Sequence, residues 1–282
     1  MSNLKKLSTS RDFLRMVAVI SLFIGHIYTS ILWRYFIVGS HDVDATIVYV
    51  IAIVDMLGIN HIAFIIAAFF VVRGLSYTAH RYIYGIRLLT LAVISEIPYD
   101  LCVNHRGEDF SKQNVVFTLL LGYLLICLLE YVKDVVRDKS YFERIMLNIG
   151  LIIMFILTAT FLRLEYSISG ILLISTLYLL QSRKIICGIM SVISVYLGMA
   201  MEFIWSSLLL DIQEGLDWKR WDVLKTIIGQ ATEKMSMTIP VTVLSILFLL
   251  FYDEKKGKIK NIYFYLFYPA HMLLLWGISL FV

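Results

Sequence analysis

The chain has 282 residues, of which 60% are hydrophobic and only 16% are charged. A mean hydropathy of +0.81 over that length excludes an ordinary soluble domain and indicates a protein that crosses a membrane several times. The net charge of +4 does not indicate nucleic-acid binding, because the basic residues lie in short loops where membrane orientation explains them. The three cysteines are scattered without a C-x-x-C pair and indicate neither a disulfide framework nor a zinc site.

The first apolar segment covers about residues 12–37 and contains the stretch RMVAVISLFIGH, which runs from Arg15 to His26. Basic residues before it and at its start place the N-terminus in the cytoplasm. The second apolar segment covers about residues 45–75. As one helix it would be about 46 Å long, which exceeds the roughly 30 Å of a hydrocarbon core. We therefore expect a broken or re-entrant segment near residues 58–61.

Further apolar spans alternate with short loops, and basic loops alternate with loops that lack basic character. The positive-inside rule holds at every loop except the mixed-charge segment at about residues 211–234. Its two tryptophans favour an interfacial helix. The sequence thus predicts an all-α polytopic membrane protein with about nine transmembrane helices. The seven later spans are expected at about residues 84–101, 114–132, 145–163, 168–181, 185–209, 236–252 and 261–281.

Ionisable side chains at membrane depth are costly and suggest a functional site. The candidates are His26, Asp55, His61, Glu96 and His271. Each also has a purely structural explanation. A lone histidine can join two helices through hydrogen bonds, and Glu96 lies two residues before a proline, where a kink frees backbone groups.

Arg15 and His26 are 11 residues apart, so on a helix they share a face and lie about 16 Å apart along the axis. This arrangement fits an extended cofactor with phosphate at one end and a reactive thioester at the other, which is the shape of an acyl-coenzyme A. The arginine would bind phosphate through its planar fork, and the histidine would act as general base toward a hydroxyl or an amine. A thioester is already activated, so we expect no metal. The chain has no H-E-x-x-H motif, nucleophile elbow or P-loop.

Several motifs resemble those of a known family. Between Tyr84 and Gly122 the chain reads RLLTLAVISEIPYDL and, after a loop, QNVVFTLLLG, which resembles the signature of the TraX family of membrane acetyltransferases. The closing NIYFYLFYPAHMLLL is similar to that family's Y-P-x-H segment, and LRLEYSISGIL to its D-Y-G-x-x-G element. The spacing of Arg15 and His26 also resembles the R-x10-H motif of the acyltransferase-3 membrane enzymes.

The resemblance implies one acyltransferase-like domain over residues 1–282, in a bacterial cytoplasmic membrane, that transfers acetyl from acetyl-CoA. The implied acceptor is a peptide N-terminus, as in conjugative pilin, or a glycan hydroxyl, and the oligomeric state stays open. The implied catalytic residues are His26, Glu96 and His271. Together with the orientation of the spans, we expect cytoplasmic acetyl-CoA to bind Arg15, Arg81 and Arg87. The implied substrate contacts are Asp100, Gln113, Asn114 and Tyr166.

The chain departs from the family pattern at several positions. Gly25 stands where an aspartate is usual, so His26 lacks a neighbouring carboxylate. The other departures are His61 for arginine, Ile65 for proline, Arg73 for glutamate, Glu165 for aspartate and Ser167 for glycine. Two alternatives therefore remain: a proton-coupled transporter or channel that uses the intramembrane acidic residues and histidines, and a non-catalytic relative that acts as a membrane partner.

Overall fold

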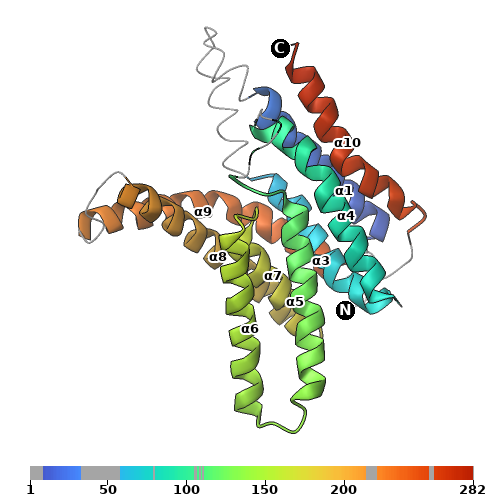
Figure 1. Cartoon of the computed structure of the whole chain (residues 1–282), viewed down its shortest axis with the longest axis vertical. Coiled ribbons are helices and arrows are strands. Elements are labelled where there is room, and N and C mark those ends of the chain that lie inside the picture. The colour runs from blue at the N-terminus through green and yellow to red at the C-terminus, as the bar shows by residue number, and fades with distance from the viewer. Residues whose placement is uncertain are drawn as a thin grey trace.

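The computed structural model describes residues 9–32, 58–78, 80–104, 107, 109, 111–213, 221–253 and 257–281. It consists of packed α-helices (Figure 1). The candidate Asp55 lies outside the described residues. The helices are α1 (Arg11–Ile27), α3 (Asn60–Tyr77), α4 (Arg81–Tyr99), α5 (Val115–Val135), α6 (Tyr141–Phe161), α7 (Ser167–Leu179), α8 (Lys184–Gln213), α9 (Trp221–Leu250) and α10 (Asn261–Ser279), with π-helical turns η2 (Tyr28–Leu32) after α1 and η4 (Asp100–Asn104) after α4.

Local sequence explains where several helices begin. The Ser10 hydroxyl accepts a hydrogen bond from the backbone N–H of Phe13 at the start of α1, and Asn114 caps α5 in the same way. Ser140 and Glu143 form a capping box at the start of α6. These caps satisfy N–H groups that have no partner inside the helix.

Helix α3 begins within the predicted break near residues 58–61. Gly58 has a φ of +59°, a conformation that glycine adopts without the steric cost of a side chain. The helix starts directly after this turn, at Asn60. The part of the predicted segment before residue 58 lies outside the described residues.

The structure confirms the all-α membrane fold. Each of the nine predicted spans overlaps one of the described α-helices. Among the described residues, six helices are long and apolar enough to cross a membrane, namely α1 with η2, α3, α5, α6, the first part of α8, and α10. Helix α7 and the Thr238–Leu250 part of α9 are shorter apolar helices, and α4 carries three arginines or glutamates along its length.

The mixed-charge segment differs from the expectation of a separate interfacial helix. Helix α8 continues to Gln213, and α9 runs without interruption from Trp221 through Pro240 to Leu250. Between Trp221 and Pro240 the chain has Gly229 as its one strong helix-weakening residue, and a single glycine costs a helix only about 1 kcal/mol. The described parts of this segment, residues 211–213 and 221–234, therefore belong to α8 and α9, whose ends lie together at the left of Figure 1.

Helix α3 lies at the centre of the fold. It packs against α1, α5, α7 and α9, and half of its 18 residues are buried. Helix α6 is the opposite case, because Ala159 is its one buried residue. Its remaining apolar surface fits contact with lipid, which is as apolar as a protein core. In Figure 1, α5 and α6 form a hairpin whose closed end lies below the rest of the molecule.

Loops that the charge pattern assigns to one side of the membrane lie together. Near the N-terminus, Thr9 pairs through its backbone with Phe251 and Asp253, and the Asp12 carboxylate accepts hydrogen bonds from the backbone N–H groups of Lys258 and Ile259 at 2.6 and 3.2 Å. The start of α1 and the described residues of the 251–260 loop are thus neighbours. Among the loops that the charge pattern assigns to the opposite side, the backbone of Gln113 pairs with the turn between α6 and α7.

Candidate functional site

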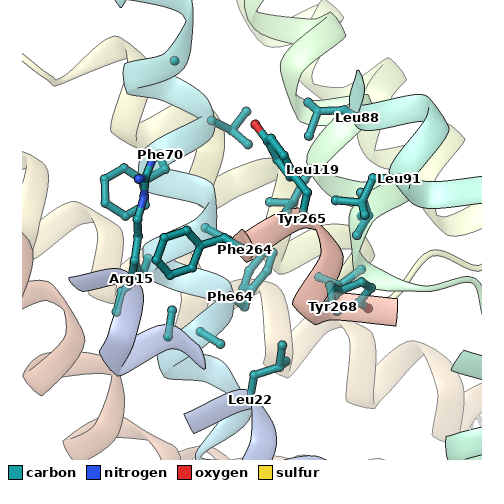
Figure 2. A pocket seen from close by; sticks show the side chains of 18 of the residues that line it. Arg15, Leu22, Phe64, Phe70, Leu88, Leu91, Leu119, Phe264, Tyr265 and Tyr268 are labelled. Atoms are coloured by element: carbon teal, nitrogen blue, oxygen red, sulfur yellow. The ribbon is translucent and has the colours of Figure 1, made fainter. Parts of the chain in front are cut away.

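A cavity of about 670 Å³ lies between α1, α3, α4, α5 and α10 (Figure 2). Its volume is in the usual range for small-molecule sites. Most of its wall is apolar or aromatic. The charged and strongly polar residues that line it are Arg11, Arg15, His26, Asn60, Arg73, Arg87, Glu165 and Asn261.

The cavity arginines come from the first turns of α1, the last part of α3 and the first half of α4, and aromatic rings lie beside three of them. The Arg15 guanidinium carbon is 5.4 Å from the centroid of the Phe70 ring and 5.0 Å from that of Phe264. Figure 2 shows the Arg15 side chain beside these two rings. Arg11 lies 5.6 Å from the ring of Tyr77. Such cation–π contacts fix a guanidinium without neutralising it, so this end of the cavity offers positive charge to an anionic ligand.

A pair of histidines lies at the far end of α1. His26 Nδ1 and His271 Nε2 are 2.7 Å apart, although 245 residues separate them in the sequence. The two rings are nearly parallel, with an interplanar angle of 11° and centroids 5.0 Å apart. Both side chains are buried, with 6% and 3% of their surface exposed. His26 lines the cavity, whereas His271 lies behind it, outside the lining.

The hydrogen-bond chain through this pair determines where the protons are. His271 Nδ1 lies 2.8 Å from the backbone carbonyl oxygen of Phe267, and a carbonyl can only accept, so Nδ1 carries a hydrogen. In a neutral ring the other nitrogen, Nε2, is then an acceptor. His26 Nδ1 must therefore donate to it, which leaves the lone pair of neutral His26 on Nε2. His271 thus sets the tautomer that a general base needs.

The turn between α6 and α7 contributes a second part of the wall. Tyr166 has a φ of +54°, which is uncommon for a residue with a side chain and indicates local backbone strain. Its ring stacks on Phe64 with centroids 4.2 Å apart, and His61 contacts it edge-on at 5.1 Å. Two residues of α3 therefore hold the predicted substrate contact Tyr166 in the cavity wall.

The start of α7 is held by a carboxylate that sequence reasoning missed. Glu202 Oε1, on α8, accepts hydrogen bonds from the backbone N–H groups of Ile168 and Ser169 at 2.7 and 2.9 Å. This is the favourable place for a negative charge at a helix N-terminus. The signal was present in the sequence, because Glu202 is an ionisable residue within a predicted span. Its contacts support the turn that carries Tyr166.

Glu165 precedes Tyr166 and also lines the cavity. Burial raises the pKa of its carboxyl group, and the Lys112 ammonium opposes that rise from a distance of 4.0 Å. The turn thus places an acidic group at the end of the cavity away from the arginines.

Other predicted site residues form a separate polar cluster. Glu96 Oε2 accepts hydrogen bonds from the backbone N–H and the side-chain amide of Asn114, and that amide also donates to the carbonyl of Ala92 at 2.9 Å. Asp100 accepts from the side chain of Asn104 and from the backbone of the following loop. The described residues that line the cavity do not include four of the predicted site residues, namely Glu96, Asp100, Gln113 and Asn114.

The cluster ties α4 to the start of α5, and one of its atoms stays without a partner. Glu96 Oε1 is buried and has no hydrogen-bond partner within the described part of the chain. The described bonds of Glu96 and Asn114 thus join α4, which contains Pro98, to the residue that caps α5.

Of the three arginines predicted to bind acetyl-CoA, two line the cavity and one does not. Arg15 and Arg87 line the cavity. Arg81 does not, because its guanidinium forms an ion pair with Glu130 of α5 at 2.5 Å and is half exposed. Arg11 and Arg73 line the cavity instead. Among the described residues there is no group of three or more histidine, cysteine, aspartate or glutamate side chains that could hold a metal ion.

The family model described as TraX protein matches residues 10–279. The chain belongs to the TraX family. The match covers nearly the whole chain and confirms the family that the SEIPYDL, QNVVF and YPAH motifs indicated. No curated protein and no solved structure matches the chain.

The structure shows the surroundings of three residues at which this TraX family protein departs from the family pattern. Arg73 lines the cavity, with its guanidinium 5.5 Å from the ring of Phe69. His61 Nδ1 lies 2.9 Å from the carbonyl of Gly58, in the turn before α3. Gly25 faces the side chain of Asn60, and a Cβ at position 25 would overlap that carboxamide. The space that a residue-25 side chain would need is thus occupied by a polar group from α3.

Proposed function

We propose that this TraX family protein is a membrane-embedded acetyltransferase. It moves an acetyl group from cytoplasmic acetyl-CoA to an amine or a hydroxyl at the membrane or its outer face, with a peptide N-terminus or a glycan as the acceptor. The observation that carries the proposal is the polarity of the cavity. Arginines line one end, and a histidine with a defined free lone pair lines the wall about 16 Å further along α1.

The cationic end suits the phosphates of coenzyme A. Arg11, Arg15, Arg73 and Arg87 line it, and the fork of a guanidinium matches phosphate oxygens geometrically. The positive-inside rule supports a cytoplasmic position for this end, where acetyl-CoA would be available. The apolar middle of the cavity would accept the pantetheine arm and exclude water from the thioester.

The transfer then needs only acid–base chemistry. His26 Nε2 takes the proton from the acceptor amine or hydroxyl as that atom attacks the thioester carbonyl carbon. The bond from the acceptor atom to carbon forms, the carbon–sulfur bond breaks, and the leaving CoA thiolate takes the proton from His26. The products are the acetylated acceptor and free CoA thiol, and neither an oxidant nor a metal takes part.

Within this proposal the remaining candidate residues have different tasks. His271 does not line the cavity and acts through His26, so it is a positioning residue. Tyr166 and Glu165 lie where an acceptor would approach from the outer face. Glu96 and Asn114 maintain the packing of α4 and α5, and Arg81 belongs to a surface ion pair.

The histidine pair gives less support to the transporter alternative. A proton relay needs a chain of groups that both give and take protons. Beyond His271 the chain reaches the backbone carbonyl of Phe267, and a carbonyl accepts hydrogen bonds without passing protons on. The pair thus fits a fixed tautomer better than a conducting path.

The test is equilibrium binding and turnover of radiolabelled acetyl-CoA by the purified full-length protein in lipid nanodiscs. We expect Arg15→Ala to lose binding and His26→Ala to bind normally but release no CoA above background. Arg81→Ala is the matched control, because it removes the same charge at the same end without touching the cavity. A wild-type protein that neither binds acetyl-CoA nor releases CoA would refute the proposal. Equal loss of binding in Arg15→Ala and Arg81→Ala would refute the assignment of the cavity.

A further inference from the structure

The arginine end of the cavity continues outward beyond Arg15, where three helix ends meet. Arg11 is the first residue of α1, Tyr77 is the last residue of α3, and Asn261 is the first residue of α10. All three line the cavity. The Arg11 guanidinium lies 5.6 Å from the centroid of the Tyr77 ring. Tyr77 is 53% exposed and Asn261 is exposed as well, so a ligand in the cavity can reach both.

Helices α1 and α10 run in the same direction, which places Asn261 at the level of Arg11. The Asp12 carboxylate accepts hydrogen bonds from the backbone just before α10, and the two histidines meet near the other end. Arg15 lies 5.0 Å from the ring of Phe264. Asn261 lies about one helical turn before Phe264, and Arg11 lies about one turn before Arg15. Asp12 itself does not line the cavity.

The length of coenzyme A divides it between these levels. About 13 bonds join the thioester sulfur to the nearest phosphorus of the diphosphate, and at the roughly 1.2 Å per bond of an extended chain they span about 16 Å. Arg15 and His26 are about 16 Å apart along α1, so a thioester beside His26 places the diphosphate at Arg15. The rest of the molecule, adenosine with its 3′-phosphate, must then lie further out, where Arg11, Tyr77 and Asn261 line the cavity.

Each of these three side chains matches one part of adenosine 3′-phosphate. A guanidinium binds phosphate oxygens through its planar fork, and the contact with Tyr77 positions Arg11 without neutralising it. An accessible aromatic ring stacks on a nucleic-acid base. An asparagine amide offers the donor and acceptor that pair with N7 and N6 of adenine. Phosphate, ring face and ring edge thus each have a partner.

We propose that Arg11, Tyr77 and Asn261 form a subsite for the adenosine 3′-phosphate of the acyl donor. This inference rests on the proposed acetyltransferase function. It assigns the 3′-phosphate to Arg11 and leaves the diphosphate to Arg15. The donor is therefore a free CoA thioester, because the phosphopantetheine arm of an acyl carrier protein has neither adenosine nor a 3′-phosphate.

The first test compares CoA with 3′-dephospho-CoA as competitors of radiolabelled acetyl-CoA, on the full-length protein in nanodiscs. We expect wild type to bind CoA at least about tenfold more tightly, since a hydrogen bond between charged groups has this order of effect. Arg11→Ala should remove this preference and keep the wild-type affinity for 3′-dephospho-CoA. Arg15→Lys should weaken both ligands by a similar factor and keep the preference. Equal affinity of wild type for the two ligands, or an unchanged preference in Arg11→Ala, would overturn the inference.

The second test concerns the base. Tyr77→Leu and Asn261→Ala should each weaken acetyl-CoA at least about fivefold, since one stacked or edge-paired base contributes this order of affinity. Tyr77→Phe keeps the ring and should retain the affinity. Acetyl-phosphopantetheine is the control ligand, because it lacks adenosine, and its affinity should not change in any of these variants. Equal loss for both ligands would show general damage to this end of the cavity and would overturn the assignment of the base.

The outcomes also distinguish this inference from the proposed function. If wild type uses acetyl-phosphopantetheine with the same kcat/KM as acetyl-CoA, the adenosine subsite is refuted and acetyl transfer stands. If wild type neither binds acetyl-CoA nor releases CoA, acetyl transfer itself fails, and the subsite fails with it.

Discussion

Replacing His271 by leucine should slow acetyl transfer without weakening the binding of acetyl-CoA. The substitution removes the acceptor for the His26 Nδ1 hydrogen at a bond of 2.7 Å between two buried side chains. An orphaned buried donor costs about 1–3 kcal/mol. If the transition state bears that whole cost, turnover falls by about 5- to 150-fold, at tenfold per 1.36 kcal/mol. The arginine end of the cavity lies about 16 Å away along α1, so the affinity for acetyl-CoA should stay unchanged.

His271→Gln is the informative partner of this variant, because its side-chain carbonyl can accept the hydrogen that His271 Nε2 accepts. We expect turnover to rank wild type, then His271→Gln, then His271→Leu, in a radiolabelled acetyl-CoA release assay. Leu274→Ala controls for general damage to α10, since Leu274 is exposed on that helix. A His271→Leu protein with wild-type turnover would refute the positioning role. So would a loss of acetyl-CoA affinity as large as that of turnover.

Three further predictions concern binding and stability. Arg15→Lys keeps the charge but loses the planar fork and the stacking between two aromatic rings. The dissociation constant for acetyl-CoA should therefore rise about tenfold, and an unchanged affinity would argue against phosphate binding at Arg15. Gly25→Ala should lower the thermal unfolding midpoint, because overpacking typically costs about 1–3 kcal/mol. Adding Asn60→Gly should restore the midpoint, and a midpoint that stays low would show that the added methyl group overlaps a different residue. Glu202→Gln should destabilise the protein by about 1 kcal/mol, because a neutral amide accepts weaker hydrogen bonds from the N–H groups of Ile168 and Ser169 than a carboxylate does. An unchanged thermal unfolding midpoint would contradict this prediction.

The helices were largely predictable because membrane spans depend on local composition. A run of about 20 apolar residues must form a helix in lipid, where every backbone polar group has to be satisfied within the segment. The length of the second segment predicted a break, and its glycine and polar residues indicated the place where α3 begins. The continuous α9 was not predicted, because a polar first half and an apolar second half look like two elements when only hydropathy is considered.

The site was predictable in part. The shared helical face of Arg15 and His26 follows from spacing, and both residues line the cavity. Family motifs pointed to His271 as well, and the structure brings it against His26. The same motifs pointed to Glu96, Asp100 and Asn114, which the structure places in hydrogen-bonded packing outside the cavity wall. A motif marks a position that the fold needs, but it does not say whether the need is chemical or structural.

The sequence by itself determined the helical membrane fold, the TraX family and the depth relation between Arg15 and His26. Each depends on residues close together in the chain, through hydropathy, short motifs or helical periodicity. Only the tertiary structure decided that His271 fixes the tautomer of His26, that Arg81 pairs with Glu130, and that Asn60 fills the space over Gly25. These pairings depend on how each helix is rotated and packed against partners far away in the sequence, and local patterns do not encode that rotation.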